Sequence, residues 1–174
     1  MLKQVRRVAL AMGMATSAAV LLLAAGAAGA QTPAKGDTIT MPDVRLLDGT
    51  VLTSADMQGK PLIIEYWASW CPFCARQNPY FESLYQKAKG SGLTVLSVSI
   101  DKKPEDAQAY MKAKNYTFPV AMETPELRQV FGKRRVIPKI FVITADGKVA
   151  EVIPGEMFEE DVLDLIKYAP GSAR

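Results

Sequence analysis

The feature that most constrains this chain is a pair of cysteines, Cys71 and Cys74, which are its only cysteines and stand three positions apart. The apolar run from Leu62 to Trp67 precedes them and predicts a strand buried on both faces. A helical pattern follows them, with apolar residues three and four positions apart. A Cys-x-x-Cys at such a junction is typical of a redox-active dithiol in an α/β fold.

The first 30 residues have the pattern of an export signal. Lys3, Arg6 and Arg7 precede an uncharged run over residues 8–30 that ends in small residues, as in secretory signal peptides. We therefore expect residues 1–30 to be a signal peptide and the protein to reside in the periplasm. An uncleaved membrane anchor is the alternative, because about 20 apolar residues are enough to span a bilayer.

Charge and composition exclude several classes of function. The chain has 21 basic and 18 acidic residues, and removing the three basic residues of the first 30 leaves equal numbers. No excess positive charge therefore remains to bind nucleic acid. Histidine is absent, which excludes a Ser-His-Asp triad, a Cys-His protease pair and a His-ligated metal. We expect no metal, and no cofactor besides a Cys71–Cys74 disulfide.

A purely structural disulfide is the plain alternative for the two cysteines. Export to an oxidising compartment would allow one to persist. However, a disulfide that closes so short a loop removes little entropy from the unfolded chain, and a longer loop would gain more. The spacing therefore favours a disulfide that exchanges over one that only stabilises.

The remaining patterns predict one α/β domain over residues 41–169, after a loose linker over 31–40 and before a tail over 170–174. Short β-type runs over residues 44–47 and 50–53, on either side of the Asp48-Gly49 turn, predict an N-terminal hairpin. Further elements are expected as strands at 93–100, 118–121, 140–144 and 149–153, and as helices at 71–89, 104–114, 125–131 and 158–168. Strands separated by helices require parallel crossovers, so we expect a mixed central sheet with helices on both faces.

Two of these helices carry specific expectations. The apolar faces of helices 71–89 and 158–168 include Phe73 and Phe158. Pro79 should kink or break the first of them, because proline removes a backbone hydrogen bond.

The start of a helix suits thiol exchange. A thiol exchanges as its thiolate, and the free N–H groups of a helix N-terminus stabilise a negative charge. We expect Cys71 to sit there and face solvent, and Cys74 to lie one turn later and deeper. The resolving Cys74 must lose a proton, and a buried carboxyl can accept it because burial raises its pKa. Glu65 is the only acid in the preceding strand and is assigned that role.

The residues around the two cysteines resemble those of a known family. The segment from Glu65 to Cys74 is similar to the active-site segment of the thioredoxin superfamily. The export signal, the hairpin and Gly59-Lys60-Pro61 resemble its exported TlpA/ResA-like branch. Four spacings support the resemblance: an acid six residues before the first cysteine, a proline five after the second, a proline before a late strand, and a glycine turn after that strand. They correspond to Glu65, Pro79, Pro138 and Asp146-Gly147.

The resemblance, which covers about residues 41–168, implies a thioredoxin-like fold and specific site residues. It implies a cis bond at Pro138 and a substrate peptide held along the backbone of Ile137. Trp70, Pro72 and Phe73 would also contact the substrate. The implied function is that of an exported thiol–disulfide oxidoreductase, which reduces protein disulfides in cytochrome c or copper-site assembly and takes electrons from a membrane thiol-reductase.

Departures from the branch leave alternatives open. Val136 and Lys139 replace the Gly and Thr that usually surround the proline, and Pro72-Phe73 is an unusual dipeptide between the cysteines. That dipeptide tunes the redox potential, so a thiol oxidase or isomerase is one alternative. A copper-delivery protein on the same fold is another, although such relatives add a histidine. A peroxidase fits less well, because the residues around Cys71 lack the expected Thr-x-x-Cys pattern.

Overall fold

The computed structural model describes residues 31–133 and 135–172. A five-stranded sheet forms its centre, in the order β5-β4-β3-β6-β7. Its strands are β3 (Leu62–Trp67), β4 (Thr94–Ser99), β5 (Val120–Met122), β6 (Lys139–Ile143) and β7 (Val149–Pro154). The first three run parallel to one another, while β6 and β7 are antiparallel to their neighbours. The mixed sheet expected from the sequence is thus confirmed.

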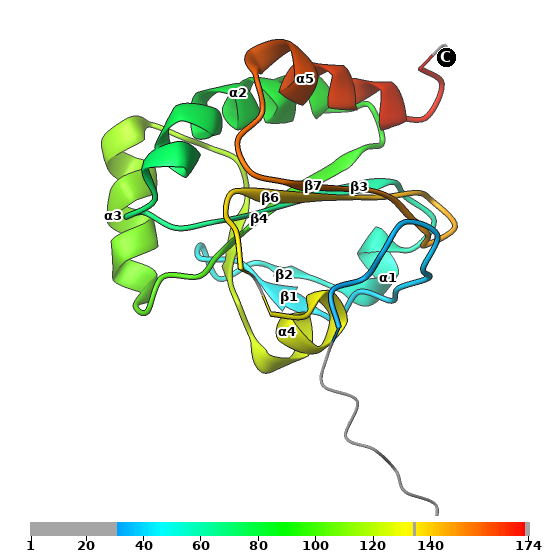
Figure 1. Ribbon diagram of the computed structural model, residues 1–174, viewed down its shortest axis with the longest axis horizontal. Helices are drawn as coiled ribbons and strands as arrows, with labels where there is room; N and C mark the ends of the chain where they lie inside the picture. Colours follow the sequence, from blue (N-terminus) through cyan, green and yellow to red (C-terminus); the bar gives the residue numbers. More distant parts are fainter. Residues whose placement is uncertain (1–30, 134, 173–174) are drawn as a thin grey trace, which may run out of the picture.

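Helices cover both faces of this sheet (Figure 1). In the view of Figure 1, α2 and α5 lie above it, and α1, α4 and the β1–β2 hairpin lie below. The helices are α1 (Ser54–Met57), α2 (Pro72–Ala88), α3 (Pro104–Lys114), α4 (Pro125–Phe131), α5 (Glu159–Asp164) and the 3₁₀ turn η1 (Leu165–Tyr168). Since α2 follows directly after the central strand β3, the two cysteines lie where that strand meets its helix.

Each face of the sheet has its own apolar core. Alternate residues of β3 point to opposite faces, so Ile63 and Trp67 pack beneath α2 while Ile64 and Tyr66 pack on the side of α4. All six residues of β3 are buried. Both cysteines belong to the core on the α2 side. The strand that carries Glu65 is therefore fixed from both sides.

The N-terminal hairpin is confirmed but is shorter than expected. Its strands are β1 (Val44–Arg45) and β2 (Val51–Leu52). Thr53, expected to close the second strand, instead caps α1 and forms a capping box with Asp56.

We expected residues 31–40 to form a loose linker, but residues 36–39 are bonded to the rest of the domain. The N–H of Gly36 donates to Val149 O, and the N–H of Ile39 donates to Gly147 O. Thr38 also bridges to Lys148. This segment therefore packs along the β6–β7 turn.

The predicted signal peptide, residues 1–30, lies outside the described residues. Within the part of the chain that the structure describes, no helix is long and apolar enough to cross a membrane.

The helices differ from the expectations in three details. Phe73, in the first turn of α2, and Phe158, the N-cap residue of α5, are 51% and 75% exposed instead of joining apolar faces. The helix expected at 158–168 is divided between α5 and η1. Pro79 lies inside α2, which continues through it without a break.

Candidate active site

Cys71 is the N-cap residue of α2, and Pro72 occupies the first helical turn. The Cys71 sulfur accepts a hydrogen bond from the backbone N–H of Cys74 at 3.2 Å. The two cysteines form a disulfide, with Cα atoms 5.3 Å apart. A sulfur at an N-cap faces the free N–H groups of a helix of 17 residues. This environment stabilises a thiolate after the disulfide opens.

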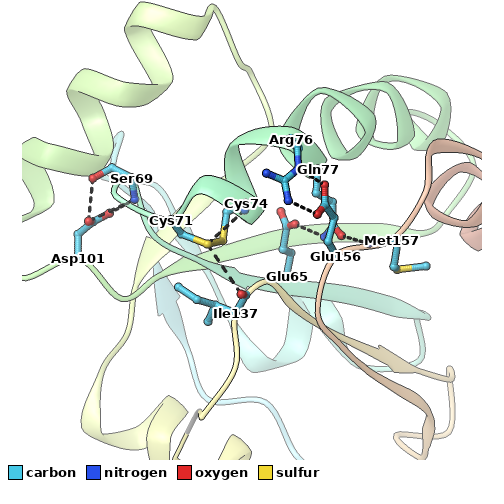
Figure 2. Close-up of a disulfide and its surroundings, with 10 residues drawn as sticks. All are labelled: Glu65, Ser69, Cys71, Cys74, Arg76, Gln77, Asp101, Ile137, Glu156 and Met157. Atoms are coloured by element: carbon cyan, nitrogen blue, oxygen red, sulfur yellow. Dashed lines mark hydrogen bonds and ion pairs between the residues drawn. A yellow bond between two sulfur atoms is a disulfide. The ribbon is translucent and has the colours of Figure 1, made fainter.

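The Cys71 sulfur is more sheltered than the sequence suggested. Cys71 is only 4% exposed, so the expectation that it faces solvent was wrong, whereas Cys74 is fully buried as expected. The shelter comes from the loop before β6. Ile137 O lies 3.8 Å from the Cys71 sulfur, where it could accept a hydrogen bond from a thiol (Figure 2).

The peptide bond between Ile137 and Pro138 is cis, as the resemblance implied. Pro138 is buried, and Ile137 is half-buried. Together with the carbonyl contact, this places the backbone of Ile137 directly beside the disulfide.

Glu65 is fully buried beneath α2, on the same face of β3 as Ile63 and Trp67. Burial raises the pKa of its carboxyl to about 8, although a hydrogen bond from Gln77 partly opposes this rise. Figure 2 shows the side chain of Glu65 rising from the sheet toward the part of α2 between Cys74 and Gln77. Oε1 is hydrogen-bonded, whereas Oε2 has no partner among the described residues. The geometry thus allows a proton to pass between Glu65 and its surroundings near neutral pH.

The loop that carries Trp70 is held by a buried carboxylate that the sequence reading missed. Asp101 accepts hydrogen bonds from the backbone N–H and hydroxyl of Ser69, and from the hydroxyl of Ser99. Because β3 and β4 are parallel and adjacent, the residues that follow them meet at one edge of the sheet. That topology was a signal that could have identified the Ser69–Asp101 contact.

Exposed apolar side chains lie next to the two cysteines and to the cis bond along the chain. Trp70 is 65% exposed, Phe73 is 51% exposed, and Val136, in the loop before the cis bond, is 47% exposed. The guanidinium of Arg76 lies 4.8 Å from the centre of the Phe73 ring, and it forms a bidentate ion pair with Glu156. Pro72 is exposed between the cysteines. A rim of this kind is suited to contact with another protein.

A second residue that the sequence reading missed is Gln77, which is buried on α2 and bonded to both Glu65 and Met157. It lies three positions after Cys74 and so faces the same side of the helix, which was the available signal. No group of three or more acidic or cysteine side chains in the described residues lies close enough to hold a metal ion.

The sequence profile of the Redoxin family matches residues 34–166. The chain belongs to the Redoxin family. Among its relatives, the thiol-disulfide oxidoreductase ResA of Bacillus subtilis is 30% identical over 125 residues, which are 69% of each chain. ResA of Geobacillus kaustophilus is 30% identical over 127 residues, covering 71% of this chain and 72% of that protein.

Solved structures confirm the thioredoxin-like fold of this Redoxin domain. A thiol:disulfide interchange protein of the thioredoxin family from Chlorobium tepidum has a TM-score of 0.70 and 29% identity, covering 80% of this chain and all of that one. StoA from Bacillus subtilis has a TM-score of 0.64 at 21% identity, which supports the fold alone. The family and its relatives identify the chain as a thiol–disulfide oxidoreductase of the ResA type.

Proposed function

We propose that this protein is an exported reductase of protein disulfides that works through a Cys71/Cys74 dithiol–disulfide cycle. The observation that supports it best is the Cys71 sulfur at the N-terminus of α2, beside the cis Ile137-Pro138 bond. Relatives named thiol-disulfide oxidoreductase point to protein substrates.

In the proposed cycle, the Cys71 thiolate attacks a substrate disulfide, and one substrate sulfur leaves as a thiolate. Glu65 takes the proton of Cys74, whose thiolate then attacks the Cys71 sulfur in the mixed disulfide. The second substrate sulfur leaves, and the Cys71–Cys74 disulfide forms. Two electrons have then moved from the protein to the substrate, and a membrane thiol-reductase would return the protein to its dithiol form.

The surface around Cys71 supports a protein substrate. Three exposed apolar side chains would contact apolar residues of the substrate: Trp70, Phe73 and Val136. The exposed Pro72 would line the same surface. The backbone of Ile137 would hold the substrate in an extended form beside the sulfur. The proposed setting is the periplasm, with residues 1–30 acting as a signal peptide or as a membrane anchor. The proposed targets are proteins of cytochrome c or copper-site assembly.

The direction of electron flow is tested by the reduction potential. Thioredoxin-fold proteins range from about −270 mV for reductants to about −120 mV for strong oxidants. Equilibration of the purified protein with glutathione redox buffers should place the Cys71–Cys74 couple toward the reducing end of this range. A potential above about −150 mV would instead make the protein an oxidant of thiols.

A further inference from the structure

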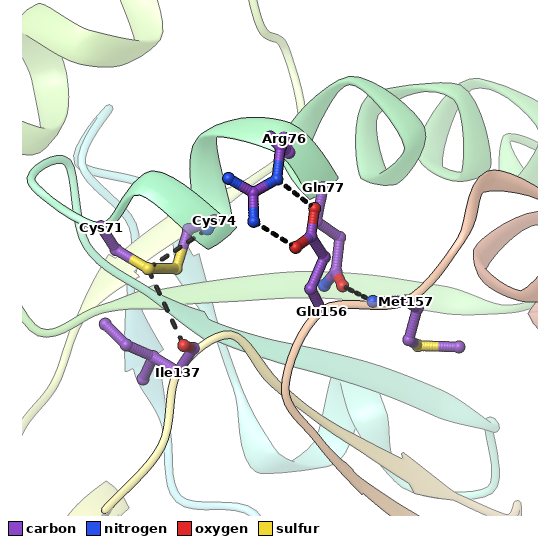
Figure 3. A network of polar contacts seen from close by, with 7 residues as sticks. All are labelled: Cys71, Cys74, Arg76, Gln77, Ile137, Glu156 and Met157. Atoms are coloured by element: carbon purple, nitrogen blue, oxygen red, sulfur yellow. Dashed lines mark hydrogen bonds and ion pairs between the residues drawn. A yellow bond between two sulfur atoms is a disulfide. The ribbon is translucent and has the colours of Figure 1, made fainter.

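The side chain of Gln77 is fully buried, yet it has a polar partner at each end. Its Nε2 donates to Glu65 Oε1 at 2.6 Å, and its Oε1 accepts from the backbone N–H of Met157 at 2.7 Å. Figure 3 shows the contact with Met157 next to the ion pair between Arg76 and Glu156. Two neighbouring residues of α2 therefore hold two neighbouring residues of the segment before α5.

Chemistry fixes the orientation of this amide. A backbone N–H can only donate, so Met157 requires the oxygen of Gln77. The NH₂ group then faces Glu65, and Glu65 Oε1 must accept. A proton on Oε1 would point at another N–H, whereas Oε2 has no hydrogen-bond partner within residues 31–133 and 135–172. The proton of the neutral carboxyl therefore belongs on Oε2.

We propose that Gln77 is a positioning residue that holds the Glu65 carboxyl through Oε1 and leaves Oε2 to take the proton of Cys74. This inference rests on the proposed function, which makes Glu65 the proton acceptor. An O–H bond forms at Oε2 as the S–H bond of Cys74 breaks, and the electron pair stays on sulfur. That thiolate attacks the Cys71 sulfur, and the bound substrate sulfur leaves with the electron pair of the broken S–S bond.

Few other groups near Glu65 can titrate. From α3 and the residues after it come Tyr110 and Tyr116, whose pKa values are raised by burial and, among smaller causes, by the charge of Glu65. The pKa of Tyr116 reaches about 12, so it stays neutral near pH 7. The neighbours of Glu65 on β4 and β6 are Ser97 and Ile140, which do not titrate. On α2, Cys74 carries the thiol proton of the proposed step, and Figure 2 shows the Glu65 side chain directed toward the part of α2 between Cys74 and Gln77.

The test compares Gln77→Met with Glu156→Gln. Gln77→Met keeps the length of the side chain but removes the N–H that lowers the Glu65 pKa. The carboxyl resonance of Glu65, followed by ¹³C NMR in the oxidised protein, should then titrate about one pH unit higher. In the reduced protein, the rising limb of disulfide-exchange activity against pH should move by the same amount, so that rates on that limb fall about tenfold. Glu156→Gln loosens the same segment without touching Glu65, and should leave both curves in place.

The inference is wrong if the Glu65 carboxyl titrates at the same pH in Gln77→Met as in the wild type. It is also wrong if Glu156→Gln shifts the titration and activity curves as far as Gln77→Met does. If Gln77→Met does not fold, Gln77→Glu replaces it. It keeps the shape and sets two carboxyls face to face, so the second proton of the pair should leave at a higher pH than the Glu65 proton of the wild type. Glu65→Gln separates the two hypotheses. An unchanged activity profile in Glu65→Gln removes the acceptor role, and this inference with it. A changed profile in Glu65→Gln but not in Gln77→Met overturns the role of Gln77 alone.

Discussion

A carboxyl with no solvent exposure, Glu65, makes the stability of this fold depend on pH. Its pKa is about 8 in the folded protein, against an ordinary value of 4.5. Between these values the folded chain keeps a proton that the unfolded chain has released. The stability contributed by the protonated carboxyl is therefore fully present below about pH 4.5, and it is lost as the pH rises through about 8.

Glu65→Gln should remove this dependence. Each pKa unit corresponds to about 1.4 kcal/mol, so between about pH 5 and about pH 8 the oxidised wild type should lose on the order of 2–4 kcal/mol relative to the variant. Urea denaturation of both oxidised proteins at the two pH values measures this difference, since the disulfide prevents Cys74 from titrating. Parallel pH curves for the two proteins would show that Glu65 is ionised in the folded state.

At the scale of elements, the loop between β3 and α2 is held in place by Asp101, which lies just after the end of β4. Asp101, 7% exposed, accepts hydrogen bonds from Ser69 and Ser99. Asp101→Ala removes the acceptor of these buried or partly buried donors. Hydrogen bonds to charged groups contribute about 1.5–3 kcal/mol each, so the variant should lose at least about 2 kcal/mol of unfolding free energy.

The same variant should slow disulfide exchange, because the loop also carries Trp70, while the pH dependence set by Glu65 stays unchanged. Denaturation curves and exchange rates at several pH values measure both effects. Asp106→Ala, on the exposed first turn of α3, is the matched control, and it should cost less than about 1 kcal/mol. Equal losses in the two variants would mean that Asp101 does not organise the loop.

The elements themselves were largely predictable, because their signals are local. The buried run of β3, proline at the start of α4 and the turn at Asp146-Gly147 all gave the right element within a residue or two. Long-range contacts were not predictable in this way. The hydrogen bonds of residues 36–39 depend on where the β6–β7 turn comes to lie, and no local pattern encodes that position.

In the candidate site, too, features set by local spacing were predictable and features set by tertiary packing were not. Cys71, Cys74, Glu65 and Pro138 stand at spacings that the sequence displays. The structure shows the disulfide, the cis bond of Pro138 beside Cys71 and the burial of Glu65 beneath α2, while the role of Glu65 stays a prediction. The exposure of Phe73 and the shelter of Cys71 depend on how α2 is seated against the loop before β6. Gln77 was overlooked because its importance lies in two partners, twelve residues before it and eighty after it.

At the scale of the whole molecule, the sheet separates the redox chemistry from a second core. Phe131, fully buried, packs with Tyr66 and Phe141 on the face away from α2, with ring centres 5.6 and 4.8 Å away. Phe131→Ala should therefore cost about 3–5 kcal/mol of unfolding free energy. The reduction potential of the Cys71–Cys74 couple should not change, because both sulfurs belong to the other core.

Phe81→Ala is the counterpart on the α2 side. Phe81 is also fully buried, but it lies on the helix that carries both cysteines. We expect a similar loss of stability together with a changed reduction potential. Denaturation and glutathione equilibration of both variants measure the contrast. A shift in potential caused by Phe131→Ala would show that the sheet does not insulate the site.

In the proposed cycle, Cys71 attacks a substrate disulfide and Cys74 resolves the mixed disulfide. Trapping tests it most directly, with Cys74→Ala and Cys71→Ala each reduced, incubated with a periplasmic extract and analysed by mass spectrometry. We predict that Cys74→Ala accumulates mixed disulfides with specific proteins through Cys71, whereas Cys71→Ala, which keeps only the fully buried sulfur, accumulates none. Trapping by Cys71→Ala instead, or by neither variant, would contradict the account.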